Sequence, residues 1–168
     1  MAEEKVNIRP IEKQDNRAIY RLIREILVSY NLDRQGTAYY DPYLKNLYEN
    51  YKNLPKAQYW ILTKDDQVYG GAGIGPFGEY EKIAEIQKYY IHKDIQGLGY
   101  GRQLYDVLMN YAIDQGYEKL YIETSDVLSK ANEIYKHYGF EHLKEPLKGT
   151  EHPLMNTWFM KDIECNQS

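Results

Sequence analysis

The chain of 168 residues is poor in cysteine and has no long apolar run. Its single cysteine, Cys165, lies in a polar tail and cannot form a disulfide within the chain, which points to a reducing, cytoplasmic setting. No run of about 18 apolar residues exists, so we expect no transmembrane helix and no membrane partner. The acidic, polar start over residues 1–5 also differs from the basic and then apolar start of a signal peptide.

The chain also lacks a long basic run, and its formal net charge is -4. This balance argues against a surface for nucleic acid. No Cys–His or Ser–His–Asp pattern stands out, and the histidines show no metal-ligand spacing, so we interpret them as solvated surface residues and expect no metal. They are His92, His137, His142 and His152. Tyrosine, in contrast, is abundant with 19 residues, and its ring and hydroxyl suit half-buried strands and pocket walls.

Apolar periodicity predicts one mixed α/β domain over residues 1–168. Strands are expected at 5–11, 59–63, 68–74, 82–92, 120–123, 140–143 and 154–160. Helices are expected at 19–30, 44–51, 104–112 and 131–138. Asp15 is the predicted N-cap of the first helix, and Gly116 is predicted to end the third. The order β-α-α-β-β-β-α-β-α-β-β therefore predicts a mixed central β-sheet flanked by helices.

The most informative segment is residues 91–102, Ile-His-Lys-Asp-Ile-Gln-Gly-Leu-Gly-Tyr-Gly-Arg. A strand runs here through a tight turn, the glycine loop (residues 96–102), directly into an amphipathic helix. Such a loop presents consecutive N–H groups at a helix N-terminus, where the dipole favours an anion. Glycine permits positive φ and lets phosphate oxygens approach the backbone. The segment therefore predicts a phosphate or pyrophosphate site, with a plain turn that opens a helix as the alternative.

Two other phosphate motifs do not fit. Residues 101–103, Gly-Arg-Gln, lack the Gly-Lys-Ser/Thr close of a P-loop. A second glycine cluster, residues 70–75, is followed by Pro76-Phe77-Gly78 rather than by a helix, unlike a dinucleotide fingerprint. We interpret this cluster as structural, with a backbone or a ligand close to a strand that breaks at Gly75 to Gly78.

Two motifs together resemble the GNAT superfamily of N-acetyltransferases. Residues 96–101, Gln-Gly-Leu-Gly-Tyr-Gly, fit the Gln/Arg-x-x-Gly-x-Gly/Ala signature of its motif A. Residues 131–140, Ala-Asn-Glu-Ile-Tyr-Lys-His-Tyr-Gly-Phe, resemble its second landmark, an alanine and then a tyrosine four residues before Gly-Phe. The motifs cover the cofactor half, about residues 82–140, and the element order extends the resemblance to the whole chain. The resemblance implies a single-domain GNAT-like fold and an acetyl-CoA-dependent acyltransferase in which a primary amine attacks the thioester directly.

The resemblance also assigns a site for coenzyme A. The backbone amides of the loop residues that follow Gln96 would bind the pyrophosphate of coenzyme A. These residues are Gly97, Leu98, Gly99, Tyr100, Gly101 and Arg102. The backbone of Tyr89, Tyr90 and Ile91, on a strand splayed by a bulge, would pair with the pantetheine arm like an added strand. A strand amide would act as the oxyanion donor. Leu128 stands where many relatives carry an asparagine that contacts coenzyme A, so this contact is in doubt.

Proton transfer requires an acid and a base. Tyr135 matches the family's acid for the departing thiolate, and the alternative is that its ring only packs on helix neighbours. A base must take a proton from the acceptor ammonium, and Glu85 and Glu123 compete for that role. Glu85 lies on the central strand, and Glu123 ends the neighbouring strand where some members carry a catalytic glutamate. Either is alternatively a solvated residue or half of an ion pair, and Glu85 is slightly favoured.

The acceptor site is expected between residues 33–43 and residues 148–152. Arg34, Tyr39 and Tyr40 would suit a small polar molecule, with Arg34 pairing to a carboxylate, and the alternative is a mobile polar loop. Three other functions stay open: a protein or peptide amine acetyltransferase, a non-catalytic acyl-CoA-binding module, and an enzyme for another acyl donor such as succinyl-CoA. A homodimer is common among relatives and is a possible assembly.

Overall fold

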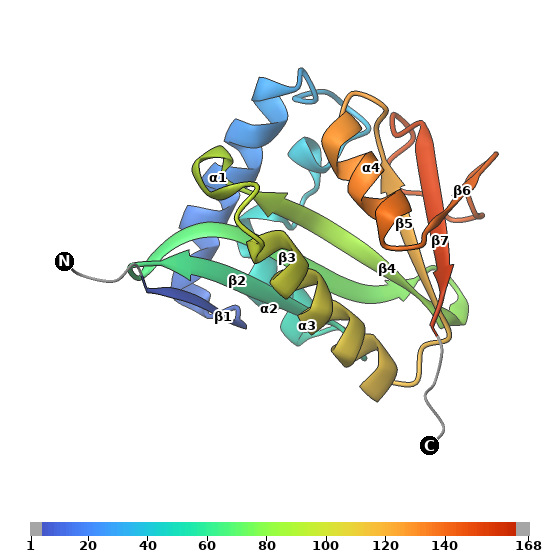
Figure 1. The fold of residues 1–168 in the computed structure, drawn as a ribbon, viewed down its shortest axis with the longest axis horizontal. Coiled ribbons are helices and arrows are strands. Elements are labelled where there is room, and N and C mark those ends of the chain that lie inside the picture. The colour runs from blue at the N-terminus through green and yellow to red at the C-terminus, as the bar shows by residue number, and fades with distance from the viewer. Residues whose placement is uncertain (1–4, 164–168) are drawn as a thin grey trace.

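The computed structural model describes residues 5–163, and it confirms the predicted order of strands and helices (Figure 1). The strands are β1 (Val6–Pro10), β2 (Gln58–Lys64), β3 (Gln67–Phe77), β4 (Tyr80–Ile91), β5 (Lys119–Thr124), β6 (Glu141–Leu143) and β7 (Thr157–Asp162). The α-helices are α1 (Asn16–Ser29), α2 (Leu47–Lys52), α3 (Tyr100–Asp114) and α4 (Ser129–His137). Short 3-10 turns are η1 (Lys13–Asp15), η2 (Ala38–Tyr40), η3 (Leu44–Asn46) and η4 (Lys93–Ile95). Cys165 lies outside the described residues.

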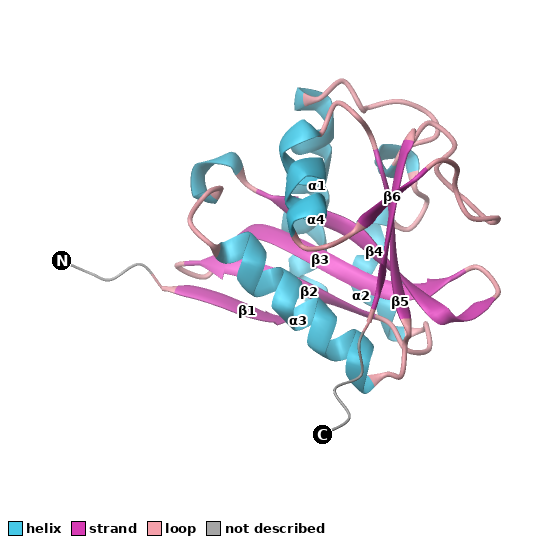
Figure 2. Cartoon of the chain, turned by 45° about the vertical axis from the view of Figure 1, so that its right-hand side comes forward, coloured by secondary structure: helices cyan, strands magenta, loops and turns pink. Residues whose placement is uncertain are grey.

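The strands form one mixed sheet in the order β1-β2-β3-β4-β5-β7-β6. All neighbouring pairs are antiparallel except β4 and β5, which run parallel. Helix α3 lies across the front of the sheet in Figure 2. Successive residues of β2 face opposite sides, so that Tyr59 and Ile61 join the core under α1 and α2 while Trp60 joins the core under α3 and α4. The sheet is therefore covered on both faces.

Strands β4 and β5 separate after a short parallel contact, and this separation (the splay) creates the site. They pair only from Ile83 to Glu85 on β4. Beyond Glu85 the two strands diverge toward the top of Figure 1, and no described strand pairs with this edge of β4 from Ile86 onward. A β-bulge lies in the diverging part, where Lys88 and Tyr89 together face Ala72 of β3, and Lys88 has a φ of 49°. A bulge bends and twists its strand, which accounts for the divergence.

One prediction about β3 needs correction. The break expected at Gly75 to Gly78 is displaced, because β3 continues through Pro76 to Phe77. Pro76 lies beyond Ile74, the last residue of β3 paired with β2, and proline is tolerated where a strand has become an edge. Gly116 does follow the end of α3, with a φ of 84°, as predicted.

Asp15 occupies the predicted N-cap position of α1 but makes no side-chain cap bond there. Its carboxylate instead accepts two hydrogen bonds from the guanidinium of Arg9, at 2.7 and 2.9 Å. It also accepts one from the backbone N–H of Glu12, at 2.8 Å. A buried carboxylate is stabilised by such charge-assisted bonds, so Asp15 ties β1 to the start of α1.

The glycine cluster of β3 makes room for neighbouring backbone, as predicted, and also for two tyrosine rings. A Cβ atom on Gly70 would lie 2.8 Å from the carbonyl oxygen of Tyr90. A Cβ atom on Gly71 would lie 2.6 Å from the ring of Tyr59, and one on Gly73 would lie 2.5 Å from the hydroxyl of Tyr51. The Tyr59 hydroxyl in turn donates to the carbonyl oxygen of Lys88 at 2.8 Å. The glycines therefore let a buried ring support the bulge of β4.

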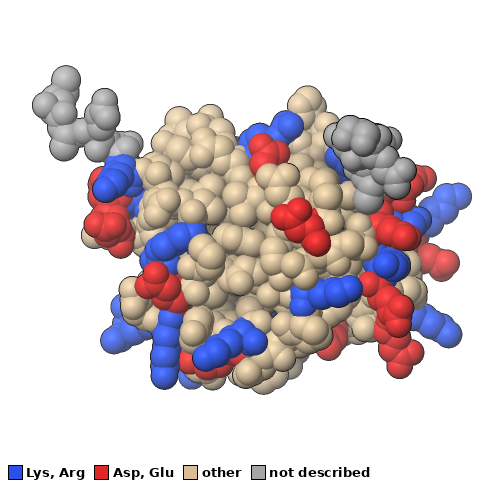
Figure 3. Space-filling view, turned by 90° about the horizontal axis from the view of Figure 1, so that it is seen from below, with Lys and Arg blue, Asp and Glu red and all other residues tan. Residues whose placement is uncertain are grey.

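The surface carries charges of both signs. Acidic and basic side chains are interspersed around the face drawn in Figure 3, and no large patch of one sign covers that face. Among residues 5–163, none of the helices has the length and apolarity needed to cross a bilayer.

Candidate active site

A cavity of about 1020 Å³ occupies the splay between β4 and β5. This volume is at the upper end of the range for small-molecule sites, which is roughly 300–1,000 Å³. All three predicted catalytic residues and most predicted cofactor residues line it: Glu85, Glu123, Tyr135, Tyr89, Tyr90, Ile91, Gln96, Gly97, Gly99, Gly101 and Arg102. Leu98 and Tyr100 belong to the glycine loop but do not line the cavity. The fold thus brings together residues from four separate segments of the chain, namely β4, the glycine loop, β5 and α4.

The glycine loop has the backbone that an anion site needs. Gly97 and Gly99 have φ values of 77° and 90°, and a Cβ atom on either would meet open space. Gly99 is also the N-cap of α3, so the loop amides and the positive end of the helix dipole occupy the same place. The space around Gly101 is more restricted, since a Cβ atom there would lie 3.3 Å from the Tyr89 hydroxyl and from the Ile91 side chain.

Two side chains fix this loop to β4. The amide nitrogen of Gln96 donates to the carbonyl oxygen of Ile91 at 2.9 Å, and the Tyr89 hydroxyl donates to the carbonyl oxygen of Gly101. Two cations, Lys93 shortly before the loop in the chain and Arg102 at its end, also line the cavity. Preorganised N–H donors with cations beside them fit a pyrophosphate.

Tyr135 reaches the cavity from α4 with its ring in an aromatic cluster. Its ring centroid lies 5.8 Å from that of Phe159, 6.0 Å from Phe140 and 6.5 Å from Tyr89. Burial raises the pKa of the Tyr135 hydroxyl, so that it stays protonated at neutral pH. Within the described part of the chain this hydroxyl has no hydrogen-bond partner. Tyr135 therefore both packs in the core and presents an available proton donor to the cavity.

Glu85 lies on β4 at the point where the splay begins. Its Oε1 accepts a hydrogen bond from Gln87 at 2.8 Å, and Gln87 accepts one from the Tyr51 hydroxyl at 2.5 Å. Burial raises the pKa of Glu85 to about 7, since the opposing bond from Gln87 is outweighed and the charge of Glu123 adds to the shift. A carboxyl group with this pKa exchanges protons near neutral pH.

Glu123 lies across the splay from Glu85 at the end of β5, and both of its oxygens accept hydrogen bonds. The Tyr121 hydroxyl donates to Oε2 at 2.9 Å, and the Thr150 hydroxyl donates to Oε1 at 2.8 Å. The bond from Thr150 holds the loop after β6 against β5. Because both oxygens are engaged, Glu123 is less available than Glu85 to take a proton.

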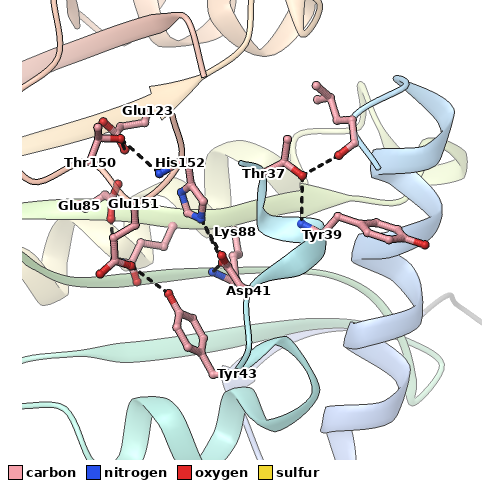
Figure 4. A network of polar contacts seen from close by, with 12 residues as sticks. Thr37, Tyr39, Asp41, Tyr43, Glu85, Lys88, Glu123, Thr150, Glu151 and His152 are labelled. Atoms are coloured by element: carbon pink, nitrogen blue, oxygen red, sulfur yellow. Dashed lines mark hydrogen bonds and ion pairs between the residues drawn. The ribbon is translucent and has the colours of Figure 1, made fainter. Parts of the chain in front are cut away.

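A charged network that the sequence did not reveal lies beside Glu85 (Figure 4). Asp41 accepts a hydrogen bond from Lys88 at 2.7 Å, and His152 lies 2.9 and 3.1 Å from its two oxygens through Nε2. The side chains of Lys88, Asp41 and His152 are only 4%, 10% and 18% exposed. The interpretation of His152 as a solvated surface residue is therefore wrong. No local signal could have found this pair, because Asp41 and His152 are 111 residues apart.

The two segments expected to form the acceptor wall do meet. Besides the Asp41–His152 contact, the Tyr43 hydroxyl donates to Glu151 at 3.4 Å. We call this end of the cavity, lined by Tyr43, Glu85, Lys88, Glu123, Glu151 and His152, the acceptor end.

The three residues named for acceptor binding lie outside the cavity lining. Arg34 and Tyr40 are exposed on the surface. The Tyr39 hydroxyl accepts a hydrogen bond from Arg24, whose guanidinium lies 4.1 Å from the centre of the Tyr39 ring. An acceptor role for these three residues stays a prediction, and the cavity lining does not support it. In the part of the chain that the structure describes, no group of three His, Cys, Asp or Glu side chains is placed to hold a metal ion.

A family model and a curated relative both match the chain to acetyltransferases. The family model described as the Acetyltransferase (GNAT) family matches residues 20–140. The uncharacterized N-acetyltransferase YjgM of Escherichia coli (strain K12) is 37% identical over 147 residues, which make up 86% of this chain and 87% of that protein.

Solved structures show the same fold at low identity. A GNAT-family acetyltransferase from Staphylococcus aureus Mu50 superposes with a TM-score of 0.84 at 20% identity, over 95% of this chain and 100% of that chain. The putative acetyltransferase yncA from Salmonella typhimurium, solved with acetyl-CoA, gives a TM-score of 0.73 at 18% identity, over 98% and 97% of the two chains.

Proposed function

The chain belongs to the GNAT family of acetyltransferases, and on that premise we propose that it transfers the acetyl group of acetyl-CoA to a primary amine on a small polar molecule. Acetyl-CoA is the co-substrate. One observation carries the proposal for the reaction. A single cavity joins an anion-binding glycine loop at one end to Glu85, with its pKa of about 7, at the other.

In this proposal the glycine loop and its cations bind the pyrophosphate of coenzyme A. The unpaired edge of β4, over Tyr89, Tyr90 and Ile91, offers backbone groups to the pantetheine arm. A backbone amide of the bulged strand acts as the oxyanion donor to the acetyl carbonyl. The chain thus positions the thioester in the splay, where an amine reaches it from the acceptor end.

Glu85 takes a proton from the acceptor ammonium, which frees the nitrogen lone pair for attack. Its raised pKa suits this step, because a base is most effective when its pKa lies near the working pH. Tyr135 donates its proton to the departing thiolate. Both groups line the cavity, and they come from β4 and α4 on opposite sides of the splay.

A small acceptor is favoured by the contacts between the two loops at the acceptor end. The loops on either side are joined by the Asp41–His152 and Tyr43–Glu151 contacts, which narrow this end of the cavity. A protein or peptide acceptor would require these contacts to open. We therefore place a small amine first and a lysine side chain of a peptide second.

The proposal is tested by following thiol release from acetyl-CoA with a panel of primary amines, namely ethanolamine, 1,4-diaminobutane, 2-phenylethylamine, L-lysine and a lysine-containing peptide. We expect at least one small amine to give saturable release and an acetylated product in mass spectrometry. Turnover of the peptide alone would favour the second acceptor class.

Replacing Tyr135→Phe tests the acid role. We expect kcat to fall about 10²-fold because the thiolate loses its proton donor, while the Kd for acetyl-CoA stays the same. Tyr111→Phe is the matched control, since Tyr111 is a partly buried tyrosine that packs on Trp60 outside the cavity. Equal kcat values for wild type and Tyr135→Phe would show that Tyr135 has a packing role alone.

A further inference from the structure

We propose that His152 is a second proton acceptor at the acceptor end of the cavity, held in place and in the required tautomer by Asp41 and Lys88. The inference rests on the acetyl transfer proposed above. It adds a catalytic group that neither sequence motif assigns.

The balanced reaction removes two protons from the acceptor nitrogen and leaves room for a second base. The acceptor nitrogen enters as an ammonium with three protons and leaves as an amide with one. Its new N–C bond forms as the C–S bond breaks, so two protons must leave the nitrogen. The departing sulfur gains one proton from Tyr135, and that tyrosine must be reprotonated, so one proton is released overall. Glu85 can take the first proton, and a second base beside it can take the other.

The contact with Asp41 determines where the proton of His152 resides. Burial favours the neutral acid of Asp41, but the hydrogen bond from His152 and the charge of Lys88 together hold its pKa below the ordinary value. Asp41 is therefore an ionised carboxylate, which can only accept hydrogen bonds. Since both of its oxygens face Nε2 of His152, the neutral ring must carry its proton on Nε2.

The other ring nitrogen is then a free base. With the proton on Nε2, the lone pair of a neutral imidazole is on Nδ1. In the described residues Nδ1 has no hydrogen-bond partner, and His152 lines the cavity. A carboxylate that fixes the tautomer of a histidine while the second nitrogen takes a proton is the arrangement of the serine hydrolase triad, here with the two nitrogens exchanged.

Lys88 gives the network its rigidity. Its backbone forms the bulge of β4, and its side chain is almost fully buried against Asp41 and lies 4.9 Å from the centre of the Tyr43 ring. Breaking a buried ion pair is costly, so Lys88 fixes Asp41, and Asp41 fixes His152. The strand that carries Glu85 therefore also positions the second base.

The charges around His152 support proton uptake. Burial disfavours the imidazolium, but the hydrogen bond and charge of Asp41 outweigh it and leave the pKa of His152 above its ordinary value. Lys88 opposes this shift, and Glu85 adds to it from the same strand. Glu151, the preceding residue, bonds to Tyr43.

The tautomer is tested without any acceptor by ¹⁵N nuclear magnetic resonance of the imidazole rings. The signal of His152 is identified as the one that His152→Gln removes from the four histidines of the chain. We expect the neutral ring of His152 to carry its proton on Nε2. We also expect Asp41→Asn to lower the pKa of His152. A neutral ring protonated on Nδ1 would overturn the proposal.

The catalytic role is tested with whichever amine of the panel has the highest kcat/KM. We expect His152→Gln to lower kcat about 10²-fold with little change in the Kd for acetyl-CoA. At pH values below the pKa of both bases, we expect a slope of log kcat/KM against pH of about 2 for the wild type and about 1 for His152→Gln. The variant loses one of the two required deprotonations. His137→Gln is the control, since His137 is exposed on α4.

The outcomes separate this inference from the function on which it rests. If the wild type releases thiol with an amine and His152→Gln matches its kcat and pH profile, only the role of His152 is refuted. A raised KM for the amine with an unchanged pH profile would show that His152 merely holds the loops together, which also refutes it. If no amine supports release by the wild type, the proposed function itself fails.

Discussion

Glu85 illustrates how its surroundings adapt one side chain to proton transfer. The carboxyl group is half-buried where β4 and β5 part, beside Gln87 and opposite Glu123. Its pKa rises from an ordinary 4.5 to about 7, chiefly because burial penalises the charged form. The same burial that makes Glu85 a useful base therefore makes its ionised form costly to the fold.

This cost predicts a pH-dependent stability. Between pH 4.5 and about 7 the folded chain holds a proton on Glu85 that the unfolded chain has released, so the contribution of Glu85 to stability is lost as pH rises. Glu85→Gln removes this titration. We therefore expect the difference in unfolding free energy between Glu85→Gln and wild type to shift in favour of the variant by about 1–3 kcal/mol from pH 5 to pH 8.

Denaturant unfolding at the two pH values measures this gain. Glu151→Gln serves as the control, because Glu151 is an exposed carboxylate of the same cavity. If the difference between Glu85→Gln and wild type is the same at pH 5 and pH 8, Glu85 is not the buried titrating group described above.

At the scale of elements, helix α3 and its two flanking glycines define the cofactor end. Gly99 and Gly116 lie at opposite ends of α3 with nearly equal φ values of 90° and 84°. A Cβ atom on either would meet no other atom within 4 Å. Only Gly99 lines the cavity, so the pair separates backbone strain from ligand binding.

We expect Gly99→Ala and Gly116→Ala to lose a similar amount of stability, about 1–2 kcal/mol each, because both force alanine into the left-handed region. Only Gly99→Ala should weaken acetyl-CoA binding, by roughly 10-fold or more, since its Cβ would stand where phosphate oxygens approach. The measurements are unfolding free energy and calorimetric Kd. Equal losses of binding in both variants would argue against a phosphate site at the glycine loop.

The sequence predicted elements better than long-range contacts. Strand and helix order follows from local periodicity, and the glycine loop and Tyr135 stand in recognisable motifs. The course of β3 through Pro76 depends on where its neighbour β2 ends, which is a property of the sheet. The Asp41–His152 pair likewise depends on two distant loops meeting, and neither residue stands in a motif.

At the scale of the molecule, the site exists because the sheet divides. Strands β1 to β4 form one part and β5 to β7 the other, joined by three parallel residue pairs. The cavity in this division carries cations beside the glycine loop, namely Lys93 and Arg102. The acceptor end carries the carboxyl groups of Glu85, Glu123 and Glu151, and Lys88, which also lines it, is paired with Asp41. This distribution of charge favours an anionic phosphate beside the glycine loop and an ammonium group at the acceptor end.

The most direct test of this account is a calorimetric titration of the purified protein with acetyl-CoA, with ATP titrated in parallel. The account predicts saturable binding of about one acetyl-CoA per chain, since one cavity holds both the glycine loop and the splayed edge of β4, and it predicts no heat from ATP, which lacks the pantetheine arm. Absence of acetyl-CoA binding by a correctly folded protein would contradict it, because the splay would then not be the site of the co-substrate.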